Sequence, residues 1–338
     1  MNRFAWLERR AEGLLVRPGG FFLDPVRPVP LAVLSHGHSD HARPGHGEVI
    51  ATPETCAILE ARYGADAFGR LRPLPTGETV ELGEVRLRLE PAGHVLGSAQ
   101  IVIEHEGTRV VWSGDYKRRP DPTCAPFAPV PCDLFVTEAT FGLPVFRHPP
   151  VAQELDKLLR ARAANPDRAI VVGAYGLGKA QRLIALLRAA GYDRPLYLHG
   201  ALLPLCALYE EHGIRLGPLL PATAGERGRA RRELAGEIVL APPSALADRW
   251  IRRLPDPLPA LASGWMRVKQ RAKQRGVELP LVISDHADWD ELLATCGEVE
   301  AEEVWITHGR EEALVHALGL RGIRARPLAL AGYEEETG

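Results

Sequence analysis

The sequence has little cysteine and no long apolar run. No stretch approaches the roughly 18 apolar residues that a bilayer-spanning helix needs, and the N-terminal MNRFAWLERRAEG lacks the apolar centre of a signal peptide. Five cysteines are scattered through 338 residues without a CxxC pair, at Cys56, Cys124, Cys132, Cys206 and Cys296. This usage argues against a disulfide framework, and we expect reduced thiols in a cytoplasmic protein with no membrane partner.

The net charge is also small, at −2, but the charges are unevenly distributed. The segment from Arg147 to Glu278 holds 22 of the 41 Lys and Arg residues and only 12 of the 43 Asp and Glu residues. The basic residues concentrate at Arg227–Arg232, Arg249–Arg253 and Arg267–Arg275. A basic surplus confined to one segment predicts a polyanionic partner, although basic residues also solvate helices without binding anything.

A chain of this length predicts two domains, and its pattern changes near residue 150. Before that point, short apolar or alternating runs separated by turns predict strands, with one helix at Pro53–Tyr63. After it, strands and helices alternate, as in a parallel α/β domain. A helix at Ala245–Arg253 and a strand at Leu281–Ser284 belong to this prediction.

A cluster of histidines follows the apolar run Leu31–Leu34 in the segment LAVLSHGHSDHARPGH. His36 and His38 are two residues apart, so an extended backbone turns both imidazoles the same way. Asp40 and His41 follow where the chain bends away, and they can reach a second position. Three imidazoles and a carboxylate at a strand end are typical of a metal site, and one such segment can serve two metals.

Further histidines and acids stand at the ends of other predicted strands. His94 lies between two strands, Asp115 follows Val110–Gly114, His308 follows Val304–Thr307, and Asp24 follows Phe21–Leu23. Singly, each is an ordinary turn residue. Together they supply a dinuclear site, in which a carboxylate bridges two ions about 3.5–4 Å apart, and Asp115 is the candidate bridge.

Two more residues have the pattern of an acid–base pair. Glu138 ends the strand Leu134–Thr137, and His286 follows Leu281–Ser284 in SDHAD. A carboxylate hydrogen-bonded to an imidazole orients it and raises its pKa, so that the histidine can protonate a leaving alkoxide. The two metals would supply a bound hydroxide as nucleophile and neutralise charge on a phosphate.

A glycine-rich stretch, Gly173-Ala-Tyr175-Gly-Leu-Gly178-Lys179, has the spacing of a nucleotide-binding P-loop. Ala180 stands where the Mg²⁺-binding hydroxyl would be, so nucleotide hydrolysis is not expected. Backbone N–H groups at the helix start and Lys179 can instead hold a nucleic-acid phosphate. The alternative is a packing turn without a ligand.

These motifs resemble the metallo-β-lactamase superfamily and its β-CASP nuclease branch, through HGHSDH, His94, Asp115, His308, GHVLGSA, SGDY and GAYGLGKAQ. In that branch motif A is an acid, here Glu138, motif B a histidine, here His286, and motif C a histidine, here His308. At finer grain, SGDYKRRPDPTCAPF and TEATFGLPVFRHP resemble the bacterial ligase-associated DNA damage response exonucleases.

The resemblance implies a fold, a ligand set and partners. The fold would be a metallo-β-lactamase αββα sandwich, of residues 1–145 and 281–338, with an inserted α/β β-CASP domain at 146–280. One metal would be held by His36, His38 and His94, and the other by Asp40, His41 and His308. Asp115 would bridge them and Asp24 would orient ligands. Histidine-rich ligation favours Zn²⁺, and mixed His/Asp sites also accept Mn²⁺.

The same resemblance implies a DNA exonuclease that works in repair, in the 5′ to 3′ direction, on a single strand or a duplex end. Asp40, Glu138 and His286 would be catalytic, and Tyr175, Lys179, Ser284 and Asp285 would lie at the DNA phosphates. Asp285 departs from the SGHAD of related nucleases. A DNA ligase and other repair proteins are the implied protein partners.

Three other functions compete with this one. A β-CASP ribonuclease in RNA processing would use the same metal ligands, because only the shape of the pocket reads the 2′-OH. A small-molecule hydrolase is disfavoured by the basic segment and by the Glu138/His286 pair. An inactive nucleic-acid-binding scaffold is disfavoured because every expected ligand position is filled.

Overall fold

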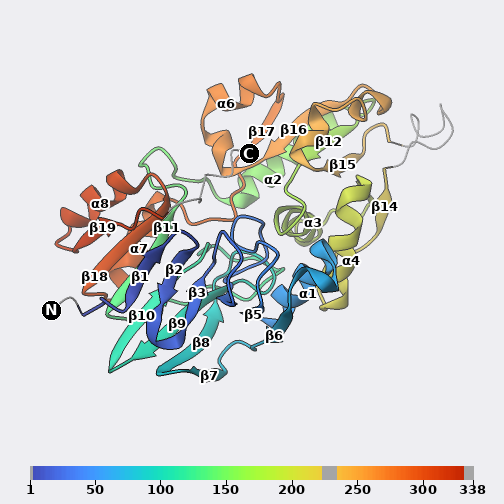
Figure 1. Cartoon of the computed structure of the whole chain (residues 1–338). Coiled ribbons are helices and arrows are strands. Elements are labelled where there is room, and N and C mark those ends of the chain that lie inside the picture. The colour runs from blue at the N-terminus through green and yellow to red at the C-terminus, as the bar shows by residue number, and fades with distance from the viewer. Residues whose placement is uncertain (1–2, 223–233, 331–338) are drawn as a thin grey trace. The chain divides into compact units, whose positions relative to one another are not determined.

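The computed structural model describes residues 3–222 and 234–330 (Figure 1). The chain divides into two compact units. Unit 1 comprises Met1–Pro120, Cys124–Pro144 and His286–Thr337, and unit 2 comprises Asp121–Thr123 and Val145–Asp285. Unit 2 is thus inserted in the sequence of unit 1. The basic residues at 227, 229, 231 and 232 lie outside the described residues.

Unit 1 contains two mixed sheets. The first has the order β1-β2-β3-β4-β5-β6, with β1 Leu7–Arg10, β2 Gly13–Val16, β3 Phe21–Leu23, β4 Leu31–Val33, β5 Glu48–Ala51 and β6 Arg70–Pro73. The second has the order β19-β18-β11-β10-β9-β8-β7. Its strands are β7 Thr79–Leu82, β8 Val85–Pro91, β9 Ala99–His105, β10 Thr108–Trp112, β11 Leu134–Ala139, β18 Glu303–Gly309 and β19 Ala325–Pro327.

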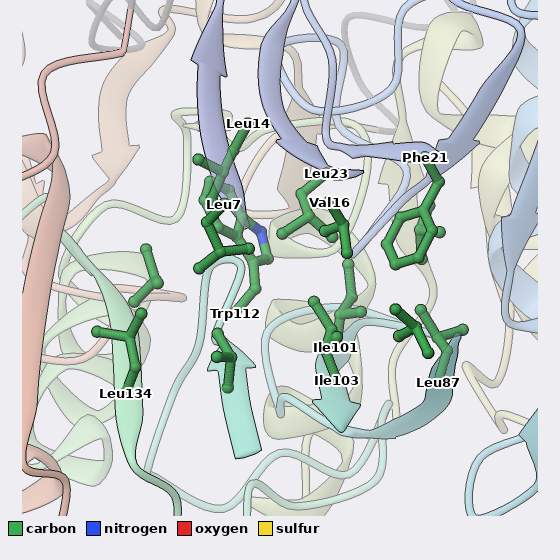
Figure 2. Close-up of a cluster of buried hydrophobic side chains, with 14 of the residues drawn as sticks. Leu7, Leu14, Val16, Phe21, Leu23, Leu87, Ile101, Ile103, Trp112 and Leu134 are labelled. Carbon is green, nitrogen blue, oxygen red and sulfur yellow. The ribbon is translucent and has the colours of Figure 1, made fainter. Parts of the chain in front are cut away.

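The main core of unit 1 lies between these two sheets. Figure 2 shows side chains of the first sheet, such as Leu14 and Phe21, pointing toward side chains of the second, such as Ile101 and Trp112. Successive residues of a strand point to opposite faces. In β10, Val110 and Trp112 therefore enter this core, whereas Val111 packs on the other side of its sheet.

Helices cover the outer face of each sheet. On the first sheet, Leu59 of α1 (Pro53–Tyr63) packs with Leu34 and Val49. On the second, α7 (Trp289–Glu298) and α8 (Glu311–Gly319) pack with Val111 and Ile306 and their neighbours. The layers are therefore helix, sheet, sheet and helix, and the predicted αββα fold is confirmed.

Strand direction brings the candidate site residues to one edge of each sheet. In the second sheet β10, β11 and β18 are parallel, and β8 and β10 are both antiparallel to β9. The carboxyl ends of β8, β10, β11 and β18 consequently share an edge. His94 and Asp115 follow β8 and β10, and Glu138 and His308 lie at the ends of β11 and β18. In the first sheet β3 and β4 are parallel, so Asp24 and His36, which follow these strands, also lie at one edge of the sheet.

Unit 2 is a six-stranded parallel sheet with the order β14-β13-β15-β12-β16-β17. Its strands are β12 Ile170–Gly173, β13 Leu196–Leu198, β14 Leu219–Pro221, β15 Ile238–Ala241, β16 Leu258–Ala262 and β17 Leu279–Leu281. The helices are α2 Val151–Ala164, α3 Lys179–Ala189, α4 Leu203–Glu211 and α6 Lys269–Gln274. The parallel α/β arrangement predicted for this segment is confirmed.

Some predicted elements of unit 2 are wrong. Residues 245–253 form two short 3₁₀ turns, η4 Pro243–Leu246 and η5 Ile251–Arg253, because their apolar residues pack into the sheet from an irregular backbone. The strand predicted at Leu281–Ser284 runs from Leu279 to Leu281 instead. β16 escaped prediction because Pro259 in its middle is unusual for an inner strand.

Among the described residues, the structure contains no helix with the length and apolar character required to cross a membrane.

Candidate metal centre

Three imidazoles converge where the loop after β4 meets the turn after β8. The Nδ1 atom of His38 lies 3.0 Å from Nε2 of His36 and 3.0 Å from Nε2 of His94. His36 and His94 are buried, and His38 is half-buried. Each ring turns a nitrogen toward the same small space, and a carboxylate oxygen of Asp115 completes this set within 4.8 Å. This is a set of donors with the composition of a zinc site.

Asp115 lies between this set and a second group of donors. Its Oδ2 atom is 3.5 Å from Nε2 of His36, 3.7 Å from Nε2 of His94 and 3.4 Å from Nε2 of His41. One carboxylate oxygen therefore reaches imidazoles of both predicted ligand sets. This is the position that a bridging ligand requires.

The second group contains Asp40, His41 and His308. Nε2 of His41 is 3.7 Å from Oδ2 of Asp40, and the rings of His41 and His308 stack with their centroids 5.0 Å apart. The Oδ1 atom of Asp40 is buried without a hydrogen-bond partner among the residues described. A buried carboxylate oxygen without a partner costs free energy unless a cation or donor satisfies it.

A bulge in β18 directs His308 into this group. Glu138 of β11 pairs with Thr307 and Ala139 pairs with Gly309, so His308 is the extra residue. Its φ of 57° lies in the left-handed region, which a histidine rarely adopts. A bulge changes the direction of one side chain in an otherwise regular strand, and such strain concentrates at functional sites.

The buried carboxylate of Asp24 ties the second group to the sheet beneath it. Its Oδ2 atom accepts hydrogen bonds from Nδ1 of His41 at 2.9 Å, from Nε1 of Trp112 at 2.9 Å and from Oγ of Ser35 at 2.6 Å. Its Oδ1 atom accepts from the Ser35 amide at 2.7 Å. The bond to Nδ1 fixes the tautomer of His41, so that Nε2 offers its lone pair to the site.

Burial and charge set the protonation of these imidazoles. Burial lowers the pKa of His36 well below its ordinary value and lowers the pKa of His308 to about 4. Burial also works against a charge on His41, but Asp115 and Asp40 outweigh it and raise the pKa of His41 well above its ordinary value. The site therefore combines neutral imidazoles, which can donate lone pairs, with carboxylates that favour a positive charge beside them. At His41 that charge is either a proton on the ring or a metal ion that replaces the proton.

These donors have the chemistry that divalent ions require. A metal ligand must be a neutral imidazole or an ionised carboxylate, and His41 and His286 outweigh burial to hold the pKa of Asp115 well below its ordinary value. The structure brings together the side chains predicted from the sequence: His36, His38, Asp40, His41, His94, Asp115 and His308. Their roles as ligands stay a proposal.

A second pair of side chains lies next to Asp115. Nδ1 of His286 lies 2.9 Å from Oε2 of Glu138 and 4.0 Å from Oδ2 of Asp115. Glu138 is buried, and its Oε1 atom accepts a 2.8 Å hydrogen bond from the Tyr116 amide. With both carboxylate oxygens engaged, Glu138 holds His286 in one orientation. Asp115, Glu138 and His286 also group closely enough to hold an ion themselves.

The start of α7 holds the backbone next to His286. The amide of Ala287 donates to the carbonyl of Tyr116 at 2.7 Å. Asp288 caps the helix, accepting from the amides of Asp290 and Glu291 at 3.1 Å. Arg119 donates to Asp288 at 2.7 Å and to Glu291 at 3.0 Å. These roles of Asp288 and Arg119 were not predicted from the sequence, although the Asp-x-x-Glu spacing at 288–291 is a capping-box signal.

In unit 2, Lys179 and Asp285 are buried in an ion-pair cluster. Nζ of Lys179 lies 2.9 Å from Oδ2 of Asp285 and donates to the Ile283 carbonyl at 2.9 Å. Arg182 donates to Oδ1 of Asp285 at 2.9 Å and to the Ser284 carbonyl, and its Nε lies 3.4 Å from Oδ2 of Asp121. These contacts fix the segment 283–285. The phosphate-binding role predicted for Tyr175, Lys179, Ser284 and Asp285 stays a prediction.

Comparison with known proteins places residues 5–172 in a domain family described as the Beta-lactamase superfamily domain. The chain is similar to a "Probable DNA ligase" of Opitutus terrae, with 30% identity over 324 residues, 95% of this chain and 31% of that protein. It therefore spans about a third of that relative. It is also similar to "Ribonuclease TTHA0252" of Thermus thermophilus, with 28% identity over 94% of this chain and 89% of that one.

Two further similarities concern a part of the chain and the fold. "Endoribonuclease YSH1" of Gibberella zeae is 26% identical over 174 residues, 48% of this chain and 20% of that protein. A crystal structure of a protein of unknown function from Enterococcus faecalis V583 superimposes with a TM-score of 0.59. The superposition covers 90% of this chain and 80% of the Enterococcus chain, at 15% sequence identity. It therefore shows a shared fold.

Replacement of Asp24 should weaken metal binding. In Asp24→Ala, His41 loses the acceptor that fixes its tautomer, and loss of such a supporting group typically lowers metal affinity about ten- to a hundredfold. Competition with a chromogenic zinc chelator measures the affinity. Asp66→Ala, which removes an exposed carboxylate from the same unit, is the control. Equal affinity in both variants would contradict the role of Asp24.

Replacement of Asp285 should destabilise the protein. Asp285→Ala leaves the cations of Lys179 and Arg182 buried with fewer acceptors, and breaking a buried ion pair on one side costs about 3–5 kcal/mol. Urea unfolding followed by fluorescence measures the loss. Asp167→Ala, an exposed position in unit 2, should change stability by less than about 0.5 kcal/mol. A similarly small effect of Asp285→Ala would show that the cluster contributes little.

Proposed function

Because the chain belongs to the metallo-β-lactamase superfamily and to its β-CASP nuclease branch, we propose that it is a metal-dependent DNA exonuclease acting in repair. The observation that carries the proposal is the Glu138–His286 pair beside Asp115. A hydrolase of this kind needs an acid group next to its metal site, and His286 is in the right place to be one. The proposed direction is 5′ to 3′.

Two sets of side chains would hold the metals. His36, His38 and His94 would bind one ion, Asp40, His41 and His308 the other, and Asp115 both. The ions, when bound, would activate a water and neutralise the charge of the scissile phosphate. Zn²⁺ suits the histidine-rich set, and Mn²⁺ is the alternative.

The protein itself would orient and move a proton. The Nδ1–H of His286 donates to Glu138, so the proton for the leaving oxygen would be carried by Nε2 of the same ring. Glu138 stabilises the imidazolium by its charge and holds the ring by its geometry. Asp24, through His41, would fix the ligands before substrate binds.

DNA is the proposed substrate because of the similarity to the Opitutus protein over 95% of this chain. The same similarity supports a DNA ligase as a protein partner. RNA is the second candidate, and the similarity to the Thermus ribonuclease over most of both chains favours it. The metal-site geometry serves either sugar, because no ligand reads the 2′-OH.

A nuclease assay tests the proposal. Matched DNA and RNA strands labelled at the 5′ or 3′ end are incubated with Zn²⁺, Mn²⁺, Mg²⁺ or EDTA. We expect short products from the 5′ end of DNA, none with EDTA, and none from Asp40→Ala, although that variant should still bind DNA. Preferential cutting of RNA would favour the ribonuclease. Absence of cleavage with every metal would contradict both.

The acid role of His286 has its own test. His286→Ala should slow cleavage while both metals remain bound, as measured by metal analysis after dialysis. Loss of metal would identify His286 as a ligand, an arrangement that its grouping with Asp115 and Glu138 also allows.

The N-terminal cap of α7 should affect the rate of the proton transfer by His286. Asp288→Ala removes the cap and the Arg119 contact beside His286, and displacement of a catalytic group by about 1 Å can cost up to about a hundredfold in rate. We expect slower turnover at unchanged metal content, with activity largely restored in Asp288→Asn, since Asn caps helices equally well. Full activity of Asp288→Ala despite a lower melting temperature would contradict a positioning role.

A further inference from the structure

The sheet of unit 2 has a topological switch point between β12 and β16. After β12 the chain passes through α3 to β13, on one side of β12, and after β16 it passes through α6 to β17, on the other side. The two loops therefore diverge from adjacent parallel strands, β12 and β16, which Figure 1 labels. In open α/β sheets, ligands bind in the crevice outside the carboxyl ends of two such strands.

A small hollow lies at this point. It is lined by residues that follow β12, β15 and β16 and by one side of α6, among them Tyr175, Ser263, Trp265, Arg271 and Arg275. Ser263 is the last residue before η6 (Gly264–Arg267), and its hydroxyl accepts a hydrogen bond from the Trp265 amide at 3.3 Å. The hollow thus combines aromatic side chains with cations.

The Trp265 ring holds Arg271 in place. The guanidinium carbon of Arg271 lies 4.0 Å from the centroid of the indole ring, and Phe146 packs edge-on against the same ring at 5.0 Å. A guanidinium stacked on an aromatic face keeps its N–H edge available for a phosphate. Because the side chain is already ordered, less entropy is lost when it binds.

The cations of η6 and α6, with Arg275 directly after α6, have no acidic partners among the described residues. Across the described part of the chain, no carboxylate lies within ion-pair distance of any of the five: Arg267, Lys269, Arg271, Lys273 and Arg275. Arg160 and Arg168, in contrast, are paired with Asp156 and Glu278. Residues 267–275 thus carry five cations within nine residues.

Helical spacing arranges four of these cations in two rows. Arg271 and Arg275 are four residues apart and line the hollow. Lys269 and Lys273, also four apart, lie with Gln270 and Gln274 on an exposed part of α6. Residues at this spacing lie on one face of a helix. Ala272 is buried between the rows and anchors α6 on unit 2.

We propose that η6 and α6, with the hollow between β12 and β16, bind the phosphate backbone of a nucleic-acid strand. Arg271 and Arg275 hold a phosphate at the rim of the hollow, whose volume of about 10 Å³ has room for one water. Lys269 and Lys273 hold neighbouring phosphates. Unpaired cations in rows suit a polyanion, because each phosphate contact releases condensed counterions. This inference rests on the proposed nuclease function and assigns the substrate strand to residues different from Lys179 and Asp285.

The test is oligonucleotide affinity as a function of salt. Fluorescence anisotropy with a labelled single-stranded DNA, in EDTA to prevent cleavage, gives the slope of log affinity against log salt. Each double variant, Arg271→Gln/Arg275→Gln or Lys269→Gln/Lys273→Gln, should reduce the slope by about 1.4, since each phosphate contact of a single strand contributes about 0.7. At 0.1 M salt, the corresponding counterion-release contribution is roughly 25-fold in affinity.

Two comparisons make the test specific. Arg160→Gln/Arg215→Gln removes the same charge from unit 2, at α2 and next to the opposite edge strand β14, and should leave the slope unchanged. Arg271→Lys keeps the charge but loses the stacked guanidinium. It should preserve the slope and weaken binding roughly two- to fivefold, the size of an exposed cation–π contact.

The outcomes separate this inference from the proposed function. Hydrolysis of bis(p-nitrophenyl) phosphate reports on the metal site alone and should be unchanged in every variant. Variants that bind as tightly as the wild type, with cleavage intact, would overturn the inference and leave the function standing. The wild-type protein could also cleave no phosphodiester at all, while the double variants bind DNA more weakly than the wild type and with a lower slope. That result would support the inference and contradict the proposed function.

Discussion

The hydrogen bonds to the buried carboxylate of Asp24 are the constraint on which the candidate site depends. This one side chain contacts the β4 loop at Ser35, the second sheet at Trp112 and the imidazole of His41. A buried carboxylate is tolerated only when its oxygens are fully engaged, and here four donors engage them. The two sheets of unit 1 are thereby joined at the edge where the candidate ligands gather, and the position of His41 follows from the packing of both sheets.

Strand direction explains why the remaining residues gather there. Parallel strands end at the same edge of a sheet, so residues that are remote in sequence, such as Asp115, Glu138 and His308, become neighbours without any local motif. The fold supplies only this edge. The chemistry comes from loops and from a bulge, whose strained backbone at His308 is stabilised by the surrounding strand pairs.

Buried charge has two uses in this protein. In unit 1, neutral imidazoles and carboxylates are arranged around a space suited to cations. In unit 2, Lys179, Arg182, Asp121 and Asp285 neutralise one another and fix the backbone of residues 283–285. The cations of α6, in contrast, lack such partners among the described residues. Whether a basic residue is structural or available to a ligand therefore depends on its neighbours and not on its place in a motif.

The sequence by itself determined the candidate ligands, the candidate pair Glu138 and His286, the fold class and most strands, because histidines and acids at strand ends carry their own signal. The elements predicted at residues 245–253 and 281–284 were wrong, because apolar residues there are buried although the backbone is irregular. Strand β16 was not predicted, because the proline in its middle is unusual for an inner strand. Only the tertiary structure decided that Asp24 reaches Trp112, that a bulge directs His308, and that Asp285 faces two buried cations. These facts depend on contacts between distant segments, and no local periodicity or spacing records such contacts.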